Sequence, residues 1–351
     1  MPTPAPTSVP TPTPAPTATP APGALSPLHV QGNKLVNASG QTVVLHGVNH
    51  SGTEYACVQG WGMGDGPTYD QSVVTAIKSW RTNAVRVPLN EDCWLAINGV
   101  PAAYSGATYQ QFIKNWVTLL NNNGIYAILE LKWTAPGGTP ATGQVPMPDI
   151  DHSPTFWSQV ANAYKGNNAV IFELFNEPFP DNQQNSTAAW TCWRDGGTCS
   201  GVSFQAAGMQ SLVNAVRGTG ATNVVALGGV SYANALYQWL AYKPNDPLNN
   251  MAAVWHVYNF NICNTVSCYN ANAGPVLAQV PVIVTETGAD TCDATWWNTY
   301  LSWLDTSGVS YLAWVWNTWG ASCTTLSLIN DYAGTPTQMG QIYKTHLGGL
   351  P

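Results

Sequence analysis

The chain has 351 residues, a formal net charge of −7 and no basic run, and these features argue against a nucleic-acid partner. No segment approaches the apolar length that a membrane span requires, so we expect no membrane insertion. Only 8% of the residues are charged, whereas 16 are Trp and 15 are Tyr. Aromatic side chains stack on the apolar C–H faces of sugar rings, so this composition favours a carbohydrate ligand.

Residues 1–24 consist only of Pro, Thr, Ala, Ser, Val and Gly after Met1. This composition predicts a disordered, extended Pro/Thr linker that cannot bury a hydrophobic core. Because such linkers join extracellular modules, a carbohydrate-binding module on its N-terminal side is one expectation. The composition changes after residue 24, and we expect residues 25–351 to form one folded domain that acts as a monomer.

The eight cysteines predict an oxidising compartment. Their even number and the lack of a Cys-x-x-Cys pair favour disulfides over a zinc site. Many connectivities are possible, and our hypothesis is two short and two longer loops: Cys192–Cys199, Cys263–Cys268, Cys57–Cys93 and Cys292–Cys323. Disulfides indicate a secreted, extracellular protein. The residues after Met1 do not form a basic and then apolar leader, so we expect the export signal to lie upstream.

Past the linker, residues 28–36 predict a β-hairpin with turn residues at both bends. Eight short apolar runs then read as strands, at 43–48, 84–88, 125–131, 170–175, 224–228, 253–257, 281–285 and 310–315. Helical spacing follows or separates them at 70–81, 109–120, 155–164, 204–216, 232–240, 270–277, 295–304 and 339–346. Eight alternating units predict the α/β class and a closed (β/α)8 TIM barrel. An open doubly wound sheet is less compatible, because no Gly-rich phosphate turn follows the first strand.

Polar and aromatic residues recur where these strands end: Asn49, His50, Arg86, Lys132, Trp133, Asn176, Glu177, His256, Tyr258, Glu286 and Trp316. Each one alone is open to a structural reading, such as a core ion pair, a buried histidine or a packed indole. In a barrel, however, the C-terminal ends of the strands share one rim, where the chemistry of such enzymes lies. Two carboxylates on that rim are the minimum needed to hydrolyse a glycosidic bond.

An ordered subset of these residues resembles glycoside hydrolase family 5, the cellulase family, within the clan of retaining (β/α)8 glycosidases: Arg86, Asn176-Glu177-Pro178, His256-Val257-Tyr258, Glu286 and Trp316. The resemblance covers about residues 25–351, which would then be the catalytic domain. It implies that Glu177 is the acid/base and that Glu286 is the nucleophile. Arg86 would keep the pKa of Glu286 low, and the neighbouring carboxylate would favour a protonated Glu177.

The resemblance also implies a set of residues that bind the substrate or orient the carboxylates: Arg86, Lys132, Trp133, Asn176, His256, Tyr258 and Trp316. Asn176 is expected to bind the sugar 2-hydroxyl. Tyr258 is expected to bond to the nucleophile and Trp316 to form the floor of the −1 subsite. No cofactor or metal is expected, because the strand ends lack His-x-His or clustered Asp and His residues.

One position departs from the family pattern. The third strand usually ends Leu-His-Trp, whereas here it reads Leu131-Lys132-Trp133. A lysine is longer, is charged at neutral pH and cannot accept a hydrogen bond. We therefore predict that Lys132→His changes kcat or the pH optimum, and unchanged kinetics would show that position 132 does not touch the substrate.

The expected activity is that of an endo-β-1,4-glucanase, with β-mannanase as the alternative. A carbohydrate-binding pseudoenzyme and a metal-dependent hydrolase on the same fold are further alternatives, disfavoured by the two carboxylates and by the missing ligand clusters. Tryptophans in or near the predicted loops either line an extended sugar cleft or pack in the interior: Trp61, Trp94, Trp133, Trp193, Trp296 and Trp319.

Overall fold

A computed structural model describes residues 25–66 and 69–351, so the predicted linker lies outside the described residues. Eight parallel strands close into a barrel in the order β10-β11-β12-β3-β4-β5-β6-β9. Their bounds are β3 His46–Asn49, β4 Ala84–Asn90, β5 Tyr126–Trp133, β6 Val170–Glu173, β9 Val225–Gly228, β10 Met251–Tyr258, β11 Val282–Gly288 and β12 Ser310–Ala313. The predicted (β/α)8 barrel is confirmed.

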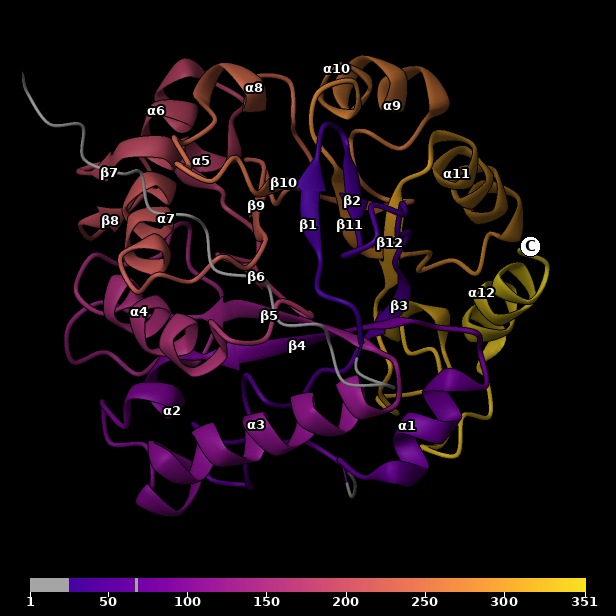
Figure 1. Cartoon of the computed structure of the whole chain (residues 1–351), viewed down its shortest axis with the longest axis horizontal. Coiled ribbons are helices and arrows are strands. Elements are labelled where there is room, and N and C mark those ends of the chain that lie inside the picture. The colour runs from indigo at the N-terminus through magenta and orange to yellow at the C-terminus, as the bar shows by residue number, and fades with distance from the viewer. Residues whose placement is uncertain (1–24, 67–68) are drawn as a thin grey trace, which may run out of the picture.

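The main helices form a ring outside the strands (Figure 1). They are α1 Gln71–Lys78, α3 Ala107–Asn122, α4 Ser153–Tyr164, α7 Met209–Arg217, α8 Trp239–Tyr242, α9 Val266–Asn272, α10 Gly274–Leu277, α11 Ala294–Ser307 and α12 Gln338–Gly348. The Asp70 carboxylate caps α1 by accepting from the backbone N–H groups of Ser72 and Val73. Among the described residues, no helix combines the length and the apolarity that crossing a bilayer would take.

Several short elements follow the strand ends and were not predicted. They are α2 Glu91–Leu95, the 3₁₀ turns η1 Ala102–Tyr104 and η2 Cys323–Thr325, α5 Pro180–Gln183, α6 Thr187–Asp195, and the small hairpin of β7 Gly196–Gly197 and β8 Ala206–Ala207. Because Ala206 and Ala207 pair with β7, the helix predicted over 204–216 begins only at Met209. These short elements surround the C-terminal rim of the barrel.

The helix predicted over 232–240 is wrong for most of its length, since only α8 at its end is helical. The residues at 231–233 have positive φ angles, which an α-helix does not allow. The Asn234 side chain instead holds the turn, because its Nδ2 donates to the carbonyl of His256 at 2.8 Å and its Oδ1 accepts from the N–H of Cys263 at 3.2 Å. The apolar spacing that suggested a helix reflects residues buried in this turn.

The N-terminal end of the barrel is apolar inside. The hairpin of β1 His29–Gln31 and β2 Lys34–Val36 lies across this end (Figure 1), and Leu28 and Leu35 join the strand residues of the lower interior in one buried cluster. That cluster includes Ile128, Ile171, Val254, Ile283 and Leu312. Successive residues on a strand face opposite sides, so the next interior positions along β5 and β6 are Glu130 and Glu173. The interior therefore changes from apolar to charged within one layer.

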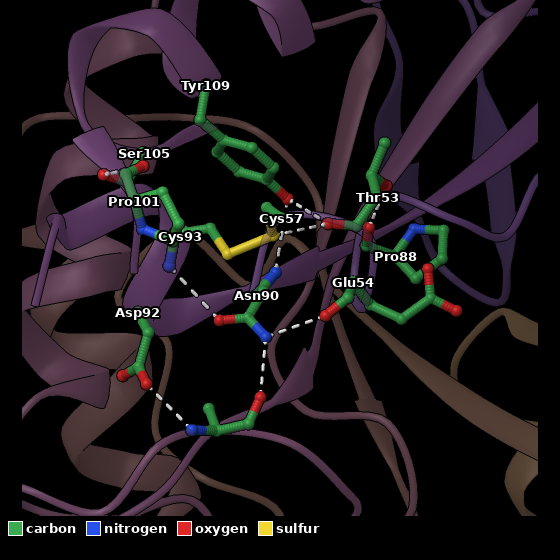
Figure 2. The surroundings of a disulfide bond; sticks show 11 residues. Thr53, Glu54, Cys57, Pro88, Asn90, Asp92, Cys93, Pro101, Ser105 and Tyr109 are labelled. Carbon is green, nitrogen blue, oxygen red and sulfur yellow. Dashed lines mark hydrogen bonds between the residues drawn. A yellow bond between two sulfur atoms is a disulfide. The ribbon is translucent and has the colours of Figure 1, made fainter. Parts of the chain in front are cut away.

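All four predicted disulfides are confirmed: Cys57–Cys93, Cys192–Cys199, Cys263–Cys268 and Cys292–Cys323. Figure 2 shows the first, which joins the loop after β3 to α2. Beside it, the Asn90 amide donates to the carbonyls of Glu54 at 2.7 Å and Ala141 at 2.8 Å. The bridge and this amide thus tie together the loops that follow β3, β4 and β5.

Candidate active site

The two predicted carboxylates meet at the C-terminal rim. Glu286 lies within β11, and Glu177 lies four residues past the end of β6, where the backbone still bonds to β5 through Asn176 N–H and Leu131 C=O at 3.1 Å. One oxygen of Glu177, one ring nitrogen of His256 and one oxygen of Glu286 all lie within 4.8 Å of one another. Glu286 is buried, whereas Glu177 is partly exposed.

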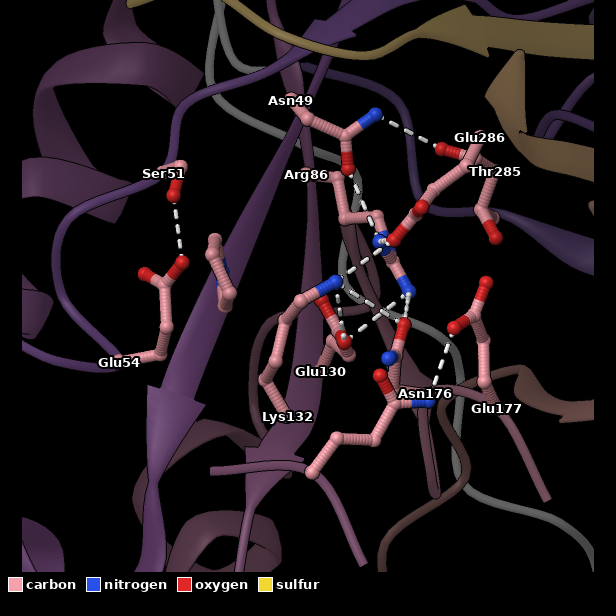
Figure 3. Close-up of polar contacts among 12 residues, drawn as sticks. Asn49, Ser51, Glu54, Arg86, Glu130, Lys132, Asn176, Glu177, Thr285 and Glu286 are labelled. Carbon is pink, nitrogen blue, oxygen red and sulfur yellow. Dashed lines mark hydrogen bonds and ion pairs between the residues drawn. The ribbon is translucent and has the colours of Figure 1, made fainter. Parts of the chain in front are cut away.

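Glu286 is surrounded by donors (Figure 3). Its Oε1 accepts from Arg86 Nη1 and, at 2.7 Å, from Lys132 Nζ, and its Oε2 accepts from the Tyr258 hydroxyl at 2.7 Å. Burial raises the pKa of Glu286, but the charges of Lys132, His256 and Arg86 together outweigh burial and hold this pKa well below its usual range. The environment therefore keeps Glu286 ionised.

Arg86 is fixed by its neighbours. Its Nε and Nη2 bind the two oxygens of Glu173 at 2.8 and 2.6 Å. Its Nη1 also donates to Asn49 Oδ1 at 2.9 Å, and its Nη2 donates to Asn176 Oδ1 at 3.0 Å. With the bond to Glu286, all five guanidinium N–H groups are in use. The guanidinium cannot shift without breaking several buried contacts.

Glu177 accepts a hydrogen bond on each oxygen. His256 Nδ1 lies 2.8 Å from Oε1, and Gln144 Nε2 donates to Oε2 at 2.8 Å. Gln144 lies in the long segment between β5 and α4, and its side chain is exposed. The sequence carries no signal for this contact, because Gln144 lies in a loop 33 positions before Glu177.

His256 links the two carboxylates to the barrel interior. Burial lowers the pKa of His256, but the charge of Glu286, the Glu173 carboxylate 3.8 Å away and the hydrogen bond to Glu177 outweigh burial and raise this pKa to about 9. A protonated ring donates from Nδ1 to Glu177 and from Nε2 to Thr285 Oγ1 at 2.9 Å. A metal ion held by Glu177, His256 and Glu286 would have to displace this proton.

Lys132 lies beside Glu286. Its Nζ contacts Glu286 Oε1 at 2.7 Å and Asn176 Oδ1 at 3.1 Å, and it stands 4.1 Å from the centre of the Trp314 ring. Burial lowers the pKa of Lys132, but the charges of Glu130 and Glu286 raise it above its usual value. Position 132 therefore brings a permanent cation to the carboxylates.

Glu130 is a second interior carboxyl group, beside Glu173, that was not among the predicted site residues. It is fully buried, with Oε1 3.1 Å from Arg86 Nη2 and 3.7 Å from Lys132 Nζ. Burial raises its pKa to about 8, although Arg86 and Lys132 lower it. Glu130 and Glu173 escaped notice because they lie inside apolar runs rather than at strand ends.

The indole beside the carboxylates is Trp314 and not Trp316. Trp316 is fully buried and packs on Trp80, with ring centres 4.9 Å apart. Trp314 is half-buried and faces Lys132. The period of two along β12, continued past the interior residue Leu312, would have pointed to Trp314. His50 is also remote from the carboxylates, buried in a stack on Tyr69 with ring centres 4.4 Å apart.

An aromatic band extends from Trp314 across the rim. The Trp319 ring centre lies 6.1 Å from that of Trp314, and Tyr55 lies 6.4 Å from Trp319, 6.1 Å from Trp133 and 5.9 Å from Trp61. Trp61 is 65% exposed and Trp319 is 43% exposed. These faces are open to a ligand.

The other loop tryptophans do not join this band. Trp94 and Trp193 are fully buried in the main hydrophobic core, which excludes them from a sugar-binding surface. Trp296 stacks on Tyr300 and donates to the carbonyl of Asn264 at 2.8 Å. A second, half-buried aromatic pair lies near Glu177 instead, where Phe179 stacks on Tyr232 with ring centres 4.5 Å apart.

Comparison with known proteins places this site in a family. Residues 36–320 match the model for cellulases of glycosyl hydrolase family 5. The chain is 24% identical over 317 residues to a mannan endo-1,4-beta-mannosidase from Salipaludibacillus agaradhaerens, covering 87% of this chain and 86% of that protein. It is 26% identical over 180 residues to Endoglucanase 1 from Robillarda sp. (strain Y-20), covering 46% and 42%. The fold matches that of the beta-glucanase SdGluc5_26A from Saccharophagus degradans with a TM-score of 0.70, 20% identity and coverage of 95% and 97%.

The closed barrel and the paired rim carboxylates define a (β/α)8 glycoside hydrolase. The chain belongs to glycoside hydrolase family 5, the cellulase family. The family implies a polysaccharide substrate. Because the named relatives include a mannosidase and an endoglucanase, the comparisons assign the reaction class but not the sugar.

Proposed function

We propose that this protein is a retaining, endo-acting glycoside hydrolase that cleaves β-1,4-glucan chains, with Glu177 as acid/base and Glu286 as nucleophile. The observation that carries the proposal is the approach of these two carboxylates to within 4.8 Å. Retaining enzymes place the pair ~5–5.5 Å apart, whereas inverting enzymes leave ~6.5–9.5 Å for a water molecule. The short separation favours direct attack by Glu286 on the sugar.

In the first step, a Glu286 oxygen attacks the anomeric carbon and the glycosidic C–O bond breaks. Glu177 gives its proton to the departing oxygen, so the negative charge passes from Glu286 to Glu177 while an ester forms. In the second step, Glu177 takes a proton from water, which attacks the anomeric carbon and releases Glu286 as a carboxylate. The partly exposed Glu177 is accessible to solvent for this exchange.

Asn176 supports binding of the sugar 2-hydroxyl. Its Oδ1 accepts from Arg86 and Lys132, which orients the amide. Its Nδ2 is buried and has no hydrogen-bond partner within the part of the chain that the structure describes. An unpaired buried donor costs free energy, and a sugar hydroxyl at this point would satisfy it.

The aromatic band supports an extended chain as substrate. Trp314, Trp319 and Tyr55 offer consecutive ring faces over more than one sugar unit, and the exposed Trp61 continues them outward. A row of ring faces that extends beyond one sugar unit suits binding within a polymer rather than at its end. The second candidate is a β-mannanase, because the mannosidase relative aligns over 87% of this chain.

We also propose that the protein acts outside the cell. Its four disulfides, with no free cysteine among the described residues, are typical of secreted proteins.

Release of reducing sugar from soluble cellulose, glucomannan and mannan tests the proposal, with Glu286→Gln alongside. The matched control is Asp195→Asn, which removes an exposed carboxylate paired with Arg194 on α6. We expect release from a glucan by the wild type and the control and none by Glu286→Gln. Preferred release from mannan would select the second candidate. Binding without release by the wild type would identify a carbohydrate-binding pseudoenzyme and overturn the proposal.

A further inference from the structure

Lys132 stands between two carboxyl groups. Lys132 and Glu130 are two residues apart on β5, so both side chains point into the barrel. The ammonium lies 2.7 Å from Glu286 Oε1 and 3.7 Å from Glu130 Oε1 (Figure 3). Its side chain is 11% exposed, so water provides little competition for these partners. The Lys132 ammonium is thus hydrogen-bonded to Glu286. A movement of about 1 Å would bring it to hydrogen-bond distance from Glu130.

Glu130 lacks a hydrogen-bond donor. It is fully buried, and neither of its oxygens accepts a hydrogen bond from any residue that the structure describes. Its nearest cation, Arg86, already uses all five N–H groups on other acceptors. A buried carboxyl group without a donor is costly. Lys132, whose ammonium has three N–H groups and two bonded partners, is the available source.

The retaining reaction changes what Lys132 can bind. In the resting site, Glu286 Oε1 accepts from both Arg86 and Lys132. Ester formation uses a lone pair of Glu286 and removes its negative charge, and that charge reappears on Glu177. Loss of this charge weakens the charge-assisted bonds to Glu286, so the donor that is free to move can leave. Arg86 is held on all sides, whereas the lysine stem is flexible.

We propose that Lys132 moves its hydrogen bond from Glu286 to Glu130 as the glycosyl-enzyme forms, and that Glu130 is a positioning residue that acts through Lys132. The inference rests on the proposed retaining mechanism. No proton is transferred in this movement, and a carboxyl oxygen accepts from the ammonium in either protonation state. The Trp314 face, 4.1 Å from Nζ, remains in contact with the cation. Glu130 thereby frees the nucleophile and keeps the buried cation paired while the ester exists.

The rate of ester formation tests the inference. A 2-deoxy-2-fluoro glycosyl fluoride of the preferred sugar reports this step, because the label accumulates on the nucleophile and the leaving fluoride needs no acid. We expect Glu130→Leu to slow labelling about tenfold, as the loss of one charge-assisted contact predicts. Glu130→Gln should slow it less, because its amide oxygen still accepts. In a Lys132→Met background, Glu130→Leu should change the labelling rate less than about twofold.

A matched control is Asp246→Asn, which breaks a buried ion pair with Arg217 at 2.8 Å, ahead of β10 and away from the rim. It should lower the melting temperature without changing the labelling rate. If Glu130→Leu slows labelling equally with and without Lys132, the inference is overturned. Glu130 would then act only through its ion pair with Arg86. If Glu130→Leu does not fold, Glu130→Gln measured in both backgrounds decides in the same way. Absence of labelling in the wild type would contradict the proposed function itself, which distinguishes the two failures.

Discussion

The two ends of the barrel interior are built from the same strands and have opposite chemistry. At the N-terminal end, Ile128 and Ile171 belong with Leu35 of the hairpin to one buried apolar cluster. One interior position further along, the same two strands carry Glu130 and Glu173. The apolar end contributes hydrophobic stabilisation, whereas the charged end holds groups that are costly to bury. Two residues along a strand separate the part that stabilises the fold from the part that does chemistry.

This contrast predicts that changes at the two ends have separable effects. At the charged end, Glu177→Ala removes the proposed acid/base and its hydrogen bonds to His256 and Gln144. We expect activity on polysaccharide to fall about 10²–10⁴-fold, while an aryl glycoside with a good leaving group still forms the ester. Kinetics on the two substrates, with thermal unfolding alongside, check this prediction. Equal losses on both substrates would mean that Glu177 is not the acid.

At the apolar end, Ile171→Ala should lower stability and spare the chemistry. The residue is fully buried in the lower cluster, so truncation should cost about 2–5 kcal/mol of unfolding free energy. Denaturant unfolding measures this loss, and kcat at a temperature where the variant is folded should stay within about twofold of the wild type. A larger drop in kcat would show that the two ends are coupled.

The charged end should also give stability a pH dependence. The pKa of His256 is raised in the folded protein to about 9, above its ordinary value of 6.5. Its stabilising contribution is therefore complete below pH 6.5 and is lost as the pH rises through about 9. Melting temperatures of the wild type and His256→Gln, taken from pH 6 to 10, should converge toward the alkaline side. If the difference in melting temperature stays constant over this pH range, the charge of His256 does not contribute to stability.

The smallest effect is expected at the edge of the charged end, where Gln144 donates to Glu177 from an exposed loop. Gln144→Ala should reduce kcat/KM on polysaccharide by a few-fold, about the worth of one exposed hydrogen bond. The rate with a glycosyl fluoride should not change, because the fluoride leaving group needs no acid. Gln144→Asn, which is one methylene shorter, serves as the control for loss of the amide. An equal loss of rate on both substrates would show that Gln144 stabilises the loop and does not act through Glu177.

The same contrast explains what the sequence could predict. Strands, their order and the rim residues Glu177, Glu286 and His256 were readable, because a polar residue that ends an apolar run stands out. Glu130 and Glu173 were not, since a charge inside a strand has the same local pattern whether it faces the barrel or the helices. Trp314 was missed because the predicted strand ran to residue 315, so the residue after its end was Trp316, whereas β12 ends at Ala313. The contact of Gln144 with Glu177 depends on the path of a loop, which no sequence periodicity predicts.

Arg86 has a consequence for how the protein is handled. Its contacts join β3 through Asn49, the end of β6 through Glu173 and Asn176, and β11 through Glu286. A one-residue slip in any of these strands would turn the partner side chain to the outside of the barrel. The environment of Glu286 therefore exists only in molecules whose sheet has closed in the correct register. Titration of the active site with a covalent glycoside would count correctly folded molecules in a preparation, which spectroscopic signals of helix content cannot do.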